Sequence, residues 1–379
     1  MDKKDIKICV YAICKNEAKF VEKWLDNMSE ADYICVLDTG STDGTYDLLK
    51  KDSRVTVVKK ESINPWRFDV ARNESMKLIP EDADVLVCTD FDEVFNKGWA
   101  DAVREAWVSK EGVNRLTYSY AWSHDGAGIP TDIFTYDKMH TRDYHWVYPV
   151  HEVLMPIDDN FEEHEVDLSD KILLEHFRDT SKPRAYYLDL LKLSCKENPD
   201  DCHVRMLLAR EYLLDKDYDN ALKEYLTTVD MPEIDNENRH LVLIETLGRI
   251  SSLYLLKGEF NNAMWYALEM MQNDKTYREP YFLMAEIYNV LGYYEMAVAT
   301  TEVGLKVAER HYTWVERANT WTYWADDLLA FAYFKLGETD KAIEHMKVCL
   351  KHMPNESRFL KNYICMLESK YNIEGVSNE

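Results

Sequence analysis

The sequence predicts two fold classes in one chain: a doubly wound α/β domain with a mostly parallel sheet, followed by an all-α domain of helical repeats. Up to about residue 120, short apolar runs alternate with amphipathic segments. After Pro183 the pattern is helical throughout. The length of 379 residues exceeds what one domain usually holds. We therefore expect one domain at residues 1–180 and a second at 184–370.

Four nearly continuous apolar runs predict the strands of the first domain. They are IKICVYAIC (6–14), YICVLD (33–38), VTVVKK (55–60) and DVLVCTD (84–90). Such runs are typical of strands buried on both faces of a parallel sheet. The segments between them carry apolar residues at helical spacing, for example EAKFVEKWLDNM (17–28). Further β-like runs in residues 115–177 should extend the sheet and cover its active edge.

The second half repeats one pattern, in which a tyrosine stands nine residues before a small residue. The tyrosine–alanine pairs are Tyr212–Ala221, Tyr254–Ala263, Tyr288–Ala297 and Tyr333–Ala342. Ala263 and Ala297 are 34 residues apart, which is the tetratricopeptide period, and the other two spacings are longer. An unrelated helical bundle is the alternative, but four matching sites favour the repeat. Residues 355–370 would then form a closing helix.

Composition excludes several classes of protein. The formal net charge of -24 argues against a nucleic-acid-binding or anionic-membrane surface. None of the eight cysteines forms a CxxC pair, so we expect neither zinc nor structural disulfides. From the N-terminal residues MDKKDIKICVYAIC we expect no secretory signal, and no segment approaches the ~20 apolar residues of a membrane span. We expect a cytoplasmic protein without a membrane span.

Asp38 stands at the end of the second predicted strand, before a turn that contains Gly40 and Gly44. Ligands of open parallel sheets bind beyond the carboxyl ends of the strands, where a carboxylate can accept hydrogen bonds from a nucleobase or a ribose hydroxyl. Residues 41–43 could cap the next helix. A purely structural strand-to-helix turn remains the alternative.

Asp90 and Asp92 follow another apolar run and lie two residues apart. In an extended chain they would face the same side, which suits one divalent cation. Two neighbouring buried carboxylates without a cation would repel each other and lose water. The alternative is that both aspartates belong to a loop and cap a helix.

Arg72 lies with Asp69 and Asn73 on adjacent turns of a predicted helix, in PWRFDVARNESM. A guanidinium group matches anionic oxygens in shape and charge, so Arg72 could bind a diphosphate or a ribose. An ion pair between Asp69 and Arg72 on the helix surface is equally compatible with the spacing.

Taken in order, five segments resemble a family 2 glycosyltransferase of the GT-A fold, which has a Rossmann-like, mostly parallel sheet. They are AICKNEAKFVEKWLDNM, VLDTGSTDGTYDLL, FDVARNESM, CTDFDEVF and YPVHEVLMP. The resemblance covers about residues 5–180. The helical repeats are similar to those of bacterial glycosyltransferases that modify peptides or proteins, including the S-glycosyltransferases of glycocins.

The resemblance implies an inverting, metal-dependent hexosyltransferase. The donor would be a nucleotide sugar, most often a UDP-sugar, and Mg²⁺ or Mn²⁺ would bind an Asp-X-Asp motif. The positions that it assigns to the nucleotide are Ile13 and Glu17 beside the nucleoside, Asp38 at the base, Arg72 at ribose or phosphate, and Asp90 near the sugar and ribose. Asp92 would ligate the metal. Many members carry a second acid where this chain has Thr39, which leaves the base contacts open.

Inversion in one step needs a base that removes the acceptor proton. HWVYPVHEVLMP places His145, His151 and Glu152 close together. Glu152 is the first candidate and His151 the second, although both could simply orient a loop. His176 stands where GT-A enzymes often have a third metal ligand. A buried histidine with satisfied hydrogen bonds is the alternative there.

These patterns favour sugar transfer to a peptide or protein acceptor that the repeats hold. Transfer to a cell-surface glycan is an alternative, and so is a tetratricopeptide scaffold with an inactive GT-A domain. A sugar nucleotidyltransferase would need a Gly-rich basic loop after the first strand, and AICKNEAKF has none. The sequence leaves open the sugar, the linking atom of the acceptor and whether the chain forms a homo-oligomer.

Overall fold

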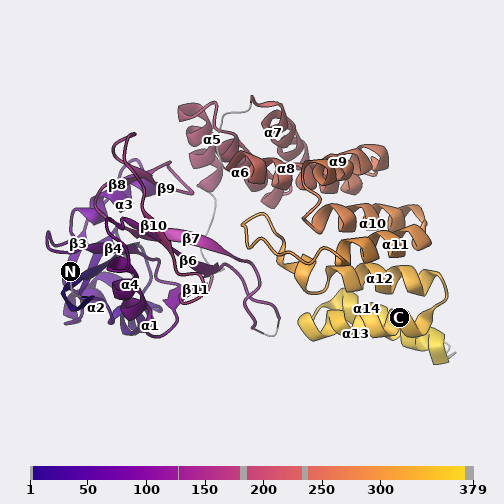
Figure 1. Ribbon diagram of the computed structural model, residues 1–379, viewed down its shortest axis with the longest axis horizontal. Helices are drawn as coiled ribbons and strands as arrows, with labels where there is room; N and C mark the ends of the chain where they lie inside the picture. The colour runs from indigo at the N-terminus through magenta and orange to yellow at the C-terminus, as the bar shows by residue number, and fades with distance from the viewer. Residues whose placement is uncertain (1–2, 127, 180–185, 233–237, 372–379) are drawn as a thin grey trace. The chain divides into compact units, whose positions relative to one another are not determined.

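The computed structural model describes residues 3–126, 128–179, 186–232 and 238–371, and its contacts separate into two compact units. The first, which we call the sheet unit, comprises Met1–Ser123 and Phe134–Glu197. The second, the helical unit, comprises His124–Ile133 and Asn198–Glu379. Figure 1 labels their helices and strands. The predicted boundary between residues 180 and 184 lies outside the described residues.

The sheet unit is built on one nine-stranded sheet whose order is β3-β2-β1-β4-β7-β6-β11-β5, with β10 paired to β6. The strands are β1 (Ile8–Cys14), β2 (Tyr33–Asp38), β3 (Val57–Lys60), β4 (Val85–Cys88), β5 (Glu93–Phe95), β6 (Arg115–Ala121), β7 (Ile133–His140), β10 (Glu165–Asp167) and β11 (Leu173–His176). The pairs among β1 to β4 are parallel, whereas β7 joins β4 antiparallel and β5 joins β11 antiparallel. The predicted mostly parallel sheet is therefore confirmed.

Side chains cover both faces of this sheet, which explains the continuous apolar runs. On one face, Val10 and Val36 pack with Trp24 and Val103 from two of the helices. On the other, Tyr11 packs with residues of a separate two-stranded hairpin formed by β8 (Tyr144–Val147) and β9 (Val153–Pro156). The helices of this unit are α1 (Val21–Met28), α2 (Thr45–Lys51), α3 (Phe68–Met76), α4 (Trp99–Trp107) and α5 (Tyr187–Glu197), with a short 3-10 turn η1 (Lys3–Asp5).

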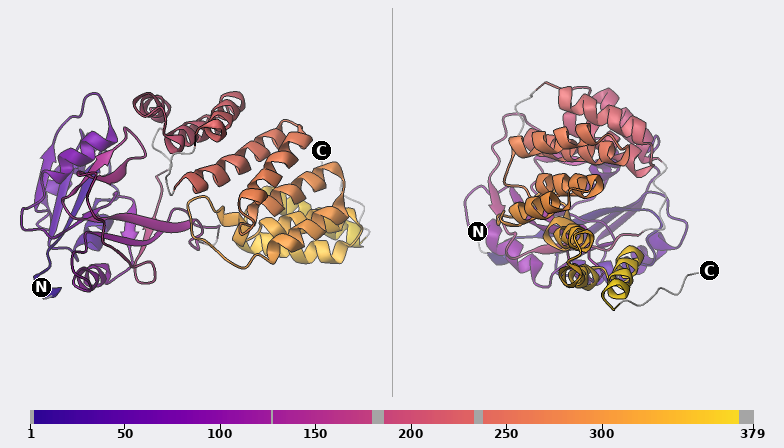
Figure 2. Two further views of the ribbon diagram at one scale, coloured as in Figure 1. Left: turned by 45° about the horizontal axis from the view of Figure 1, so that its top comes forward. Right: turned by 90° about the vertical axis from the view of Figure 1, so that its right-hand side faces the viewer.

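In the residues that the structure describes, the helical unit has four helical hairpins and a closing helix. Figure 2 shows these helices from two further directions. The hairpins are α6 (Cys202–Leu214) with α7 (Tyr218–Asp230), α8 (Asn238–Leu256) with α9 (Phe260–Asn273), α10 (Glu279–Leu291) with α11 (Tyr294–Leu305), and α12 (Trp324–Lys335) with α13 (Thr339–His352). The closing helix is α14 (Ser357–Tyr371), and a 3-10 turn, η2 (Ala318–Trp321), precedes α12. The predicted helical repeat domain is thus confirmed.

The tyrosine–alanine pattern has the same structure in all four hairpins. Five residues after each tyrosine, a backbone N–H donates to that tyrosine's carbonyl oxygen at 2.9 Å. The four bonds are Asp217 to Tyr212, Glu259 to Tyr254, Tyr293 to Tyr288 and Glu338 to Tyr333. Each alanine is the fourth residue of the second helix and is at most 1% exposed. Its backbone N–H donates to the carbonyl oxygen of that fifth residue after the tyrosine. The repeat is therefore a repeated turn and not only a repeated composition.

Close helix packing accounts for the small residues of the third hairpin. A Cβ atom at Gly304 of α11 would lie 2.8 Å from the ring of Phe282 in α10, so a larger residue would push the two helices apart. Gly292 ends α10 with a φ of +83°, which L side chains rarely adopt.

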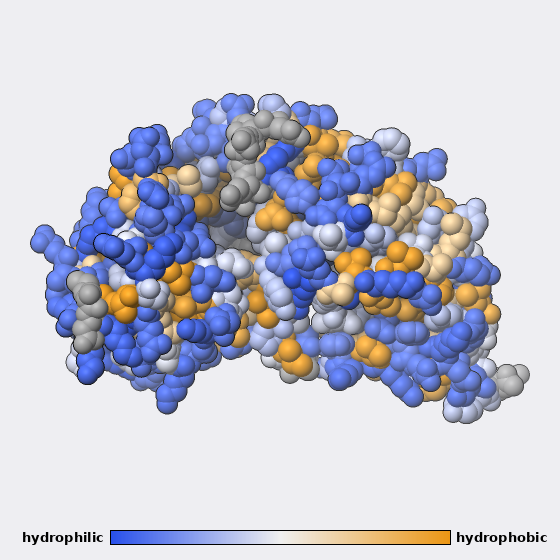
Figure 3. Space-filling view, in the orientation of Figure 1, coloured by the Kyte–Doolittle hydropathy of each residue, from blue (hydrophilic) through white to orange (hydrophobic). Residues whose placement is uncertain are grey.

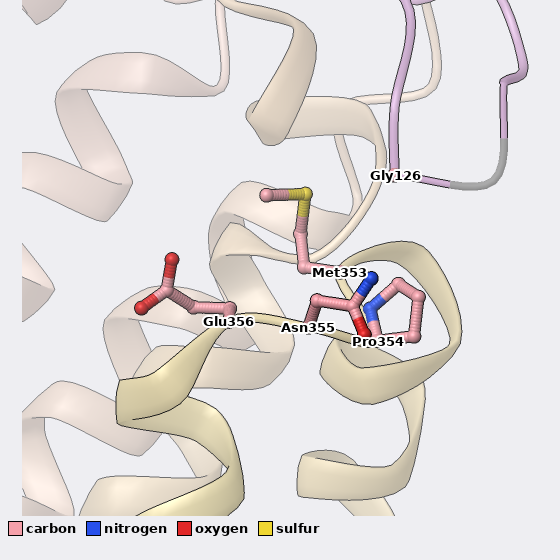
Figure 4. Close-up of a pocket in the computed structure, with 5 residues that line it drawn as sticks. All are labelled: Gly126, Met353, Pro354, Asn355 and Glu356. Atoms are coloured by element: carbon pink, nitrogen blue, oxygen red, sulfur yellow. The ribbon is translucent and has the colours of Figure 1, made fainter.

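The surface of the described residues is mainly hydrophilic, with hydrophobic patches on the face that Figure 3 shows. In the helical unit, Val290, Tyr293 and Met296 are each about half exposed. None of the helices in the described ranges is long and apolar enough to cross a bilayer. A small pocket of the helical unit is lined by Gly126 and residues 353–356, and Glu356 is the one charged residue in that lining (Figure 4).

Candidate functional site

The parallel strands bring the predicted site residues to one edge of the sheet. β1 lies between β2 and β4, and its Cys14 pairs with Asp38 while its Tyr11 pairs with Cys88. Asp38 is therefore the last residue of β2, and Asp90 lies two residues after the end of β4. The carboxyl ends of parallel strands are where open α/β sheets bind ligands.

The Asp38 carboxylate is fully buried and holds its own turn. Its Oδ1 accepts hydrogen bonds from the backbone N–H groups of Gly40 at 2.9 Å and Ser41 at 2.8 Å. The Cys14 thiol donates to Oδ2 at 3.6 Å. The helix that follows begins after Gly44, which has no side chain to cap it. Asp43, one of the expected caps, nevertheless accepts a hydrogen bond at 3.0 Å from the backbone N–H of Thr45, the first residue of that helix.

The β1–α1 loop is bonded to this turn. The backbone N–H of Asn16 donates to Ser41 Oγ at 2.9 Å, and that of Glu17 donates to Thr45 Oγ1 at 2.8 Å. Thr39 donates its hydroxyl to the Cys14 carbonyl at 2.9 Å, so the residue in place of the second acid joins two strand ends. Ile13 and Glu17, the predicted nucleoside contacts, are both at least nine-tenths buried.

Arg72 of α3 is buried and binds two of the predicted acids. Its Nη2 lies 3.0 Å from Asp90 Oδ1, and its Nε donates to Glu152 Oε1. Its Nη1 contacts the Cys88 sulfur at 3.1 Å. The alternative pairing of Arg72 with Asp69 is wrong, because Asp69 accepts two hydrogen bonds from Arg67 instead.

Asp90 remains ionised in this cluster. Burial raises the pKa of its carboxyl group, but the positive charges of Arg72 and Lys138 outweigh burial and lower the pKa to about 2. Glu93 behaves in the opposite way, since burial and the charge of Asp90 raise its pKa to about 7. Glu93 accepts from the Asp90 backbone N–H at 2.8 Å and from the Tyr120 hydroxyl at 3.0 Å.

Asp92 and His176 form a separate pair, with His176 Nε2 3.3 Å from Asp92 Oδ2. Pairing of β11 with β5 puts His176 opposite Glu93 and so beside Asp92. Burial lowers the pKa of His176, but the Asp92 carboxylate more than compensates, so the net pKa is raised. Across the described ranges, no group of three or more His, Cys, Asp or Glu residues is arranged to hold a metal ion.

The predicted bases lie in the β8–β9 hairpin. Glu152 is brought to Arg72, whereas His151 lies with its ring centroid 5.9 Å from that of Tyr187 in α5. His151 has a φ of +51°, an unusual conformation that often marks a constrained or functional site. His145 Nδ1 is buried without a hydrogen-bond partner among the described residues. The structure thus joins Glu152, and not the two histidines, to the Arg72–Asp90 cluster.

A buried hydrogen-bond chain supports this cluster through Trp146. Trp146 Nε1 donates to the Tyr11 hydroxyl at 2.9 Å, and Tyr11 lies 2.7 Å from His140 Nε2. Burial lowers the pKa of His140 to about 3, so the imidazole is neutral. Because its Nδ1 is 2.6 Å from the Thr141 carbonyl, that nitrogen carries the proton and Nε2 accepts from Tyr11.

Two cations lie near the Trp146 ring, and one of them was not predicted. Arg72 Cζ is 5.2 Å from the ring centroid and Lys138 Nζ is 5.5 Å from it. Asn73 bonds both the N–H and the carbonyl of Trp146, at 2.9 and 2.8 Å. Sequence reasoning missed Lys138 and Glu93. Glu93 directly follows the paired aspartates, which was a usable signal, whereas Lys138 is one polar residue among several in its strand.

Three solved structures with tetratricopeptide repeats or related assemblies are similar to part of this chain. The APC/C hetero-tetramer Cut9–Hcn1 is 14% identical with a TM-score of 0.42, and the match covers 49% of this chain and 34% of that chain. A thermophilic TPR protein in Thermus thermophilus is 21% identical with a TM-score of 0.37, and the match covers 48% of this chain and 88% of that chain. A tetratricopeptide repeat protein from Parabacteroides merdae is 15% identical with a TM-score of 0.38, and the match covers 49% of this chain and 67% of that chain. Because all three TM-scores are below 0.5, the repeat assignment rests on the turn geometry described above.

A comparison with curated proteins found no match. A comparison with protein-family models did find one, and most of the matched residues belong to the sheet unit. The family model described as "Glycosyl transferase family 2" matches residues 9–151, which gives the N-terminal part of this chain a glycosyltransferase family 2 domain and supports glycosyltransferase function in general.

Proposed function

We propose that this protein is an inverting glycosyltransferase that moves a hexose from a nucleotide sugar to a polypeptide. A UDP-sugar is the first candidate for the donor. The observation that carries the proposal is the charged cluster of Arg72, Asp90 and Glu152 at the carboxyl ends of parallel strands. Arg72 and Asp90 lie within residues 9–151, which match the family model, and Glu152 directly follows them. A diphosphate would bind at this edge of the sheet.

The residues at this edge fit a divalent cation. Asp92 offers a carboxylate and His176 an imidazole nitrogen, and the two groups already lie together. Mg²⁺ commonly binds through one or two carboxylates and takes its other ligands from substrate phosphates and water. Asp92 and His176 would hold the ion, which would neutralise charge on the departing diphosphate. Asp90, already bound by Arg72, would act on the sugar and ribose side.

A base must act on the acceptor. In one-step inversion the acceptor atom bonds to the anomeric carbon while the bond to the diphosphate oxygen breaks. The electron pair leaves with the nucleotide, and the acceptor proton passes to the base. Glu152 is the first candidate because Arg72 fixes its carboxylate beside the cluster, and His151 is the second. Ile13, Glu17 and Asp38 would form the wall on the nucleoside side.

The helical unit would select the acceptor. Stacked helical hairpins offer extended binding surfaces that suit unfolded peptide segments. Among its tryptophans, Trp265 of α9 is 61% exposed and could contact a partner, whereas Trp324 of α12 is core. The acidic composition of the chain favours a neutral or basic acceptor.

Calorimetry with UDP, with and without Mn²⁺, tests the donor half of this proposal. We expect heat from UDP binding that grows when Mn²⁺ is present. The Asp92→Asn variant should lose the Mn²⁺-dependent part, whereas Asp47→Asn, at an exposed position of α2, should keep it. Absence of binding by any nucleoside diphosphate would favour a scaffold with an inactive domain. Intact-mass analysis of a candidate peptide after incubation with nucleotide sugars tests the acceptor half.

A further inference from the structure

Lys138 is a buried cation without a carboxylate partner. Lys138 is only 7% exposed. Within the described ranges, no acidic side chain forms an ion pair with its ammonium group. Its described contacts are with aromatic residues: Nζ lies 4.6 Å from the Tyr136 ring centroid and 5.5 Å from that of Trp146, and it also interacts with the Tyr136 hydroxyl. Lysine is rarely buried unless it is paired, because the charge loses its water. Such a position therefore points to an anion that binds from outside the chain.

The strand pairing puts Lys138 at the strand end where the candidate site lies. β7 runs antiparallel to β4, with Leu86 opposite His140 and Val87 opposite Met139. Continuing this register places Lys138 opposite Cys88, two residues before Asp90. Burial lowers the pKa of the Lys138 ammonium, but Tyr136, Asp90 and Glu93 raise it by more, so the group stays protonated. Lys138 therefore contributes a fixed positive charge next to the Asp90 carboxylate.

Arg72, the other cation near the Trp146 ring, already has partners. Its Nη2 binds Asp90, its Nε binds Glu152, and its Nη1 contacts Cys88. A phosphate that bound Arg72 would have to displace one of these carboxylates. Lys138 has no such partner to release, and its flexible stem ends in a compact charge with three donors.

We propose that Lys138 binds the diphosphate of the nucleotide donor, beside an Arg72 that mainly holds Asp90 and Glu152 in place. This inference rests on the proposed function. The tyrosine and tryptophan rings stabilise the free ammonium through their π faces, and the phosphate oxygens would replace them as its main partners. Lys138 would also offset the repulsion between Asp90 and the incoming phosphates.

The test compares UDP with uridine, which lacks the phosphates, by calorimetry on the full chain. Lys138→Met keeps the length of the side chain and removes its charge. We expect Lys138→Met to weaken UDP binding by about tenfold or more, as for the loss of one charge-assisted contact, and to leave uridine binding unchanged. Lys138→Arg should retain most of the UDP affinity. Lys97→Met, at an exposed position after β5, is the matched control.

The UDP and uridine affinities test the role of Lys138 separately from the proposed function. Unchanged UDP affinity in Lys138→Met, or an equal loss of UDP and uridine binding, would overturn the role of Lys138 while the proposed function stands. A wild-type chain that binds no nucleoside diphosphate would overturn the proposed function and this inference together.

A measurement on the unaltered chain covers the case in which Lys138→Met fails to fold. The NMR signals of the lysine side-chain carbons can be followed in a chain labelled with ¹³C-lysine, and Lys138→Arg identifies the signal of Lys138. We expect UDP to shift the Lys138 signal and uridine to leave it where it is in the free protein. An equal shift with both ligands, or a shift with neither, would overturn the assignment.

Discussion

Trp122 and His176 contact each other twice. Their rings stack with centroids 4.5 Å apart and planes 26° apart, and the Trp122 carbonyl oxygen lies 3.3 Å from His176 Nδ1. The second nitrogen of the same imidazole points to Asp92. Trp122 therefore fixes both the position of the ring and which nitrogen is available on the side of Asp92.

Trp122→Leu should weaken Mn²⁺-dependent UDP binding by about 10- to 100-fold, the usual effect of losing a group that orients a metal ligand. The variant keeps the backbone contact and loses the ring stack. Trp122→Phe should stay close to wild type because it keeps an aromatic face. Calorimetric titration of UDP with and without Mn²⁺ measures both. Equal affinities for Mn²⁺–UDP in the Leu variant and the wild type would show that the stack does not orient His176.

Glu152→Gln should keep UDP affinity and lower kcat by about 10²-fold or more, the size of a general-base contribution. Glutamine can still accept the hydrogen bond from Arg72 Nε, so the cluster should keep its geometry. Steady-state kinetics with a peptide acceptor, combined with UDP calorimetry, separate the two effects. A parallel fall in UDP affinity and kcat would make Glu152 a support for Arg72 instead of a base.

His140 should make the sheet unit sensitive to acid. Its pKa is about 3 in the folded chain and 6.5 for an ordinary histidine, so between these values only the unfolded chain binds the proton. The free energy of unfolding should therefore fall as the pH drops below 6.5, by up to about 1.4 kcal/mol per pH unit from this group. His140→Gln should remove that part of the pH dependence.

Urea unfolding at several pH values between 6.5 and 4.5 checks the His140 prediction. His240→Gln provides the control, because its side chain is 46% exposed. The difference between wild type and His140→Gln should shrink as the pH falls. A difference that stays constant over this range would mean that His140 titrates normally in the folded chain.

Ala297→Leu should destabilise the helical unit by about 1–3 kcal/mol, because the added carbons have no space between α10 and α11. Ala299→Leu is on the same helix but exposed, so its effect should be small. Chemical denaturation of the two variants, followed by circular dichroism, gives both values. Equal stability of the two would contradict the packing role of the tyrosine–alanine pattern.

The sequence predicted the parts of the fold that depend on local pattern. Apolar runs located β1, β2 and β4, and the tyrosine–alanine spacing located the hairpins. Contacts between distant residues were not accessible in this way. Arg72 meets Glu152 across 80 positions of sequence, and its local spacing suggested Asp69 instead. The assignment of residues 124–133 to the helical unit also has no local signal.

Sequence reasoning named Asp38, Asp90, Asp92 and Arg72 as site residues and missed Glu93 and Lys138. Strand ends identify Asp38, Asp90 and Asp92 because a carboxylate after an apolar run is unusual. Lys138 lies inside a strand of mixed polarity, where alternation with apolar residues suggests solvent exposure. Only the packing of Tyr136 and Trp146 around its ammonium shows that it is buried.

The repeated turn of the helical unit has a consequence for how such chains can change length. In each turn, the backbone N–H of the fifth residue after the tyrosine donates to the tyrosine carbonyl oxygen. This hydrogen bond lies within the turn and does not depend on the length of the helices on either side. α8 has 19 residues and α10 has 13, yet their turns are alike. Insertions and deletions can therefore accumulate between hairpins without disturbing any turn. A whole hairpin could be duplicated or lost as one piece, so that the length of the helical unit could change while the sheet unit stays the same.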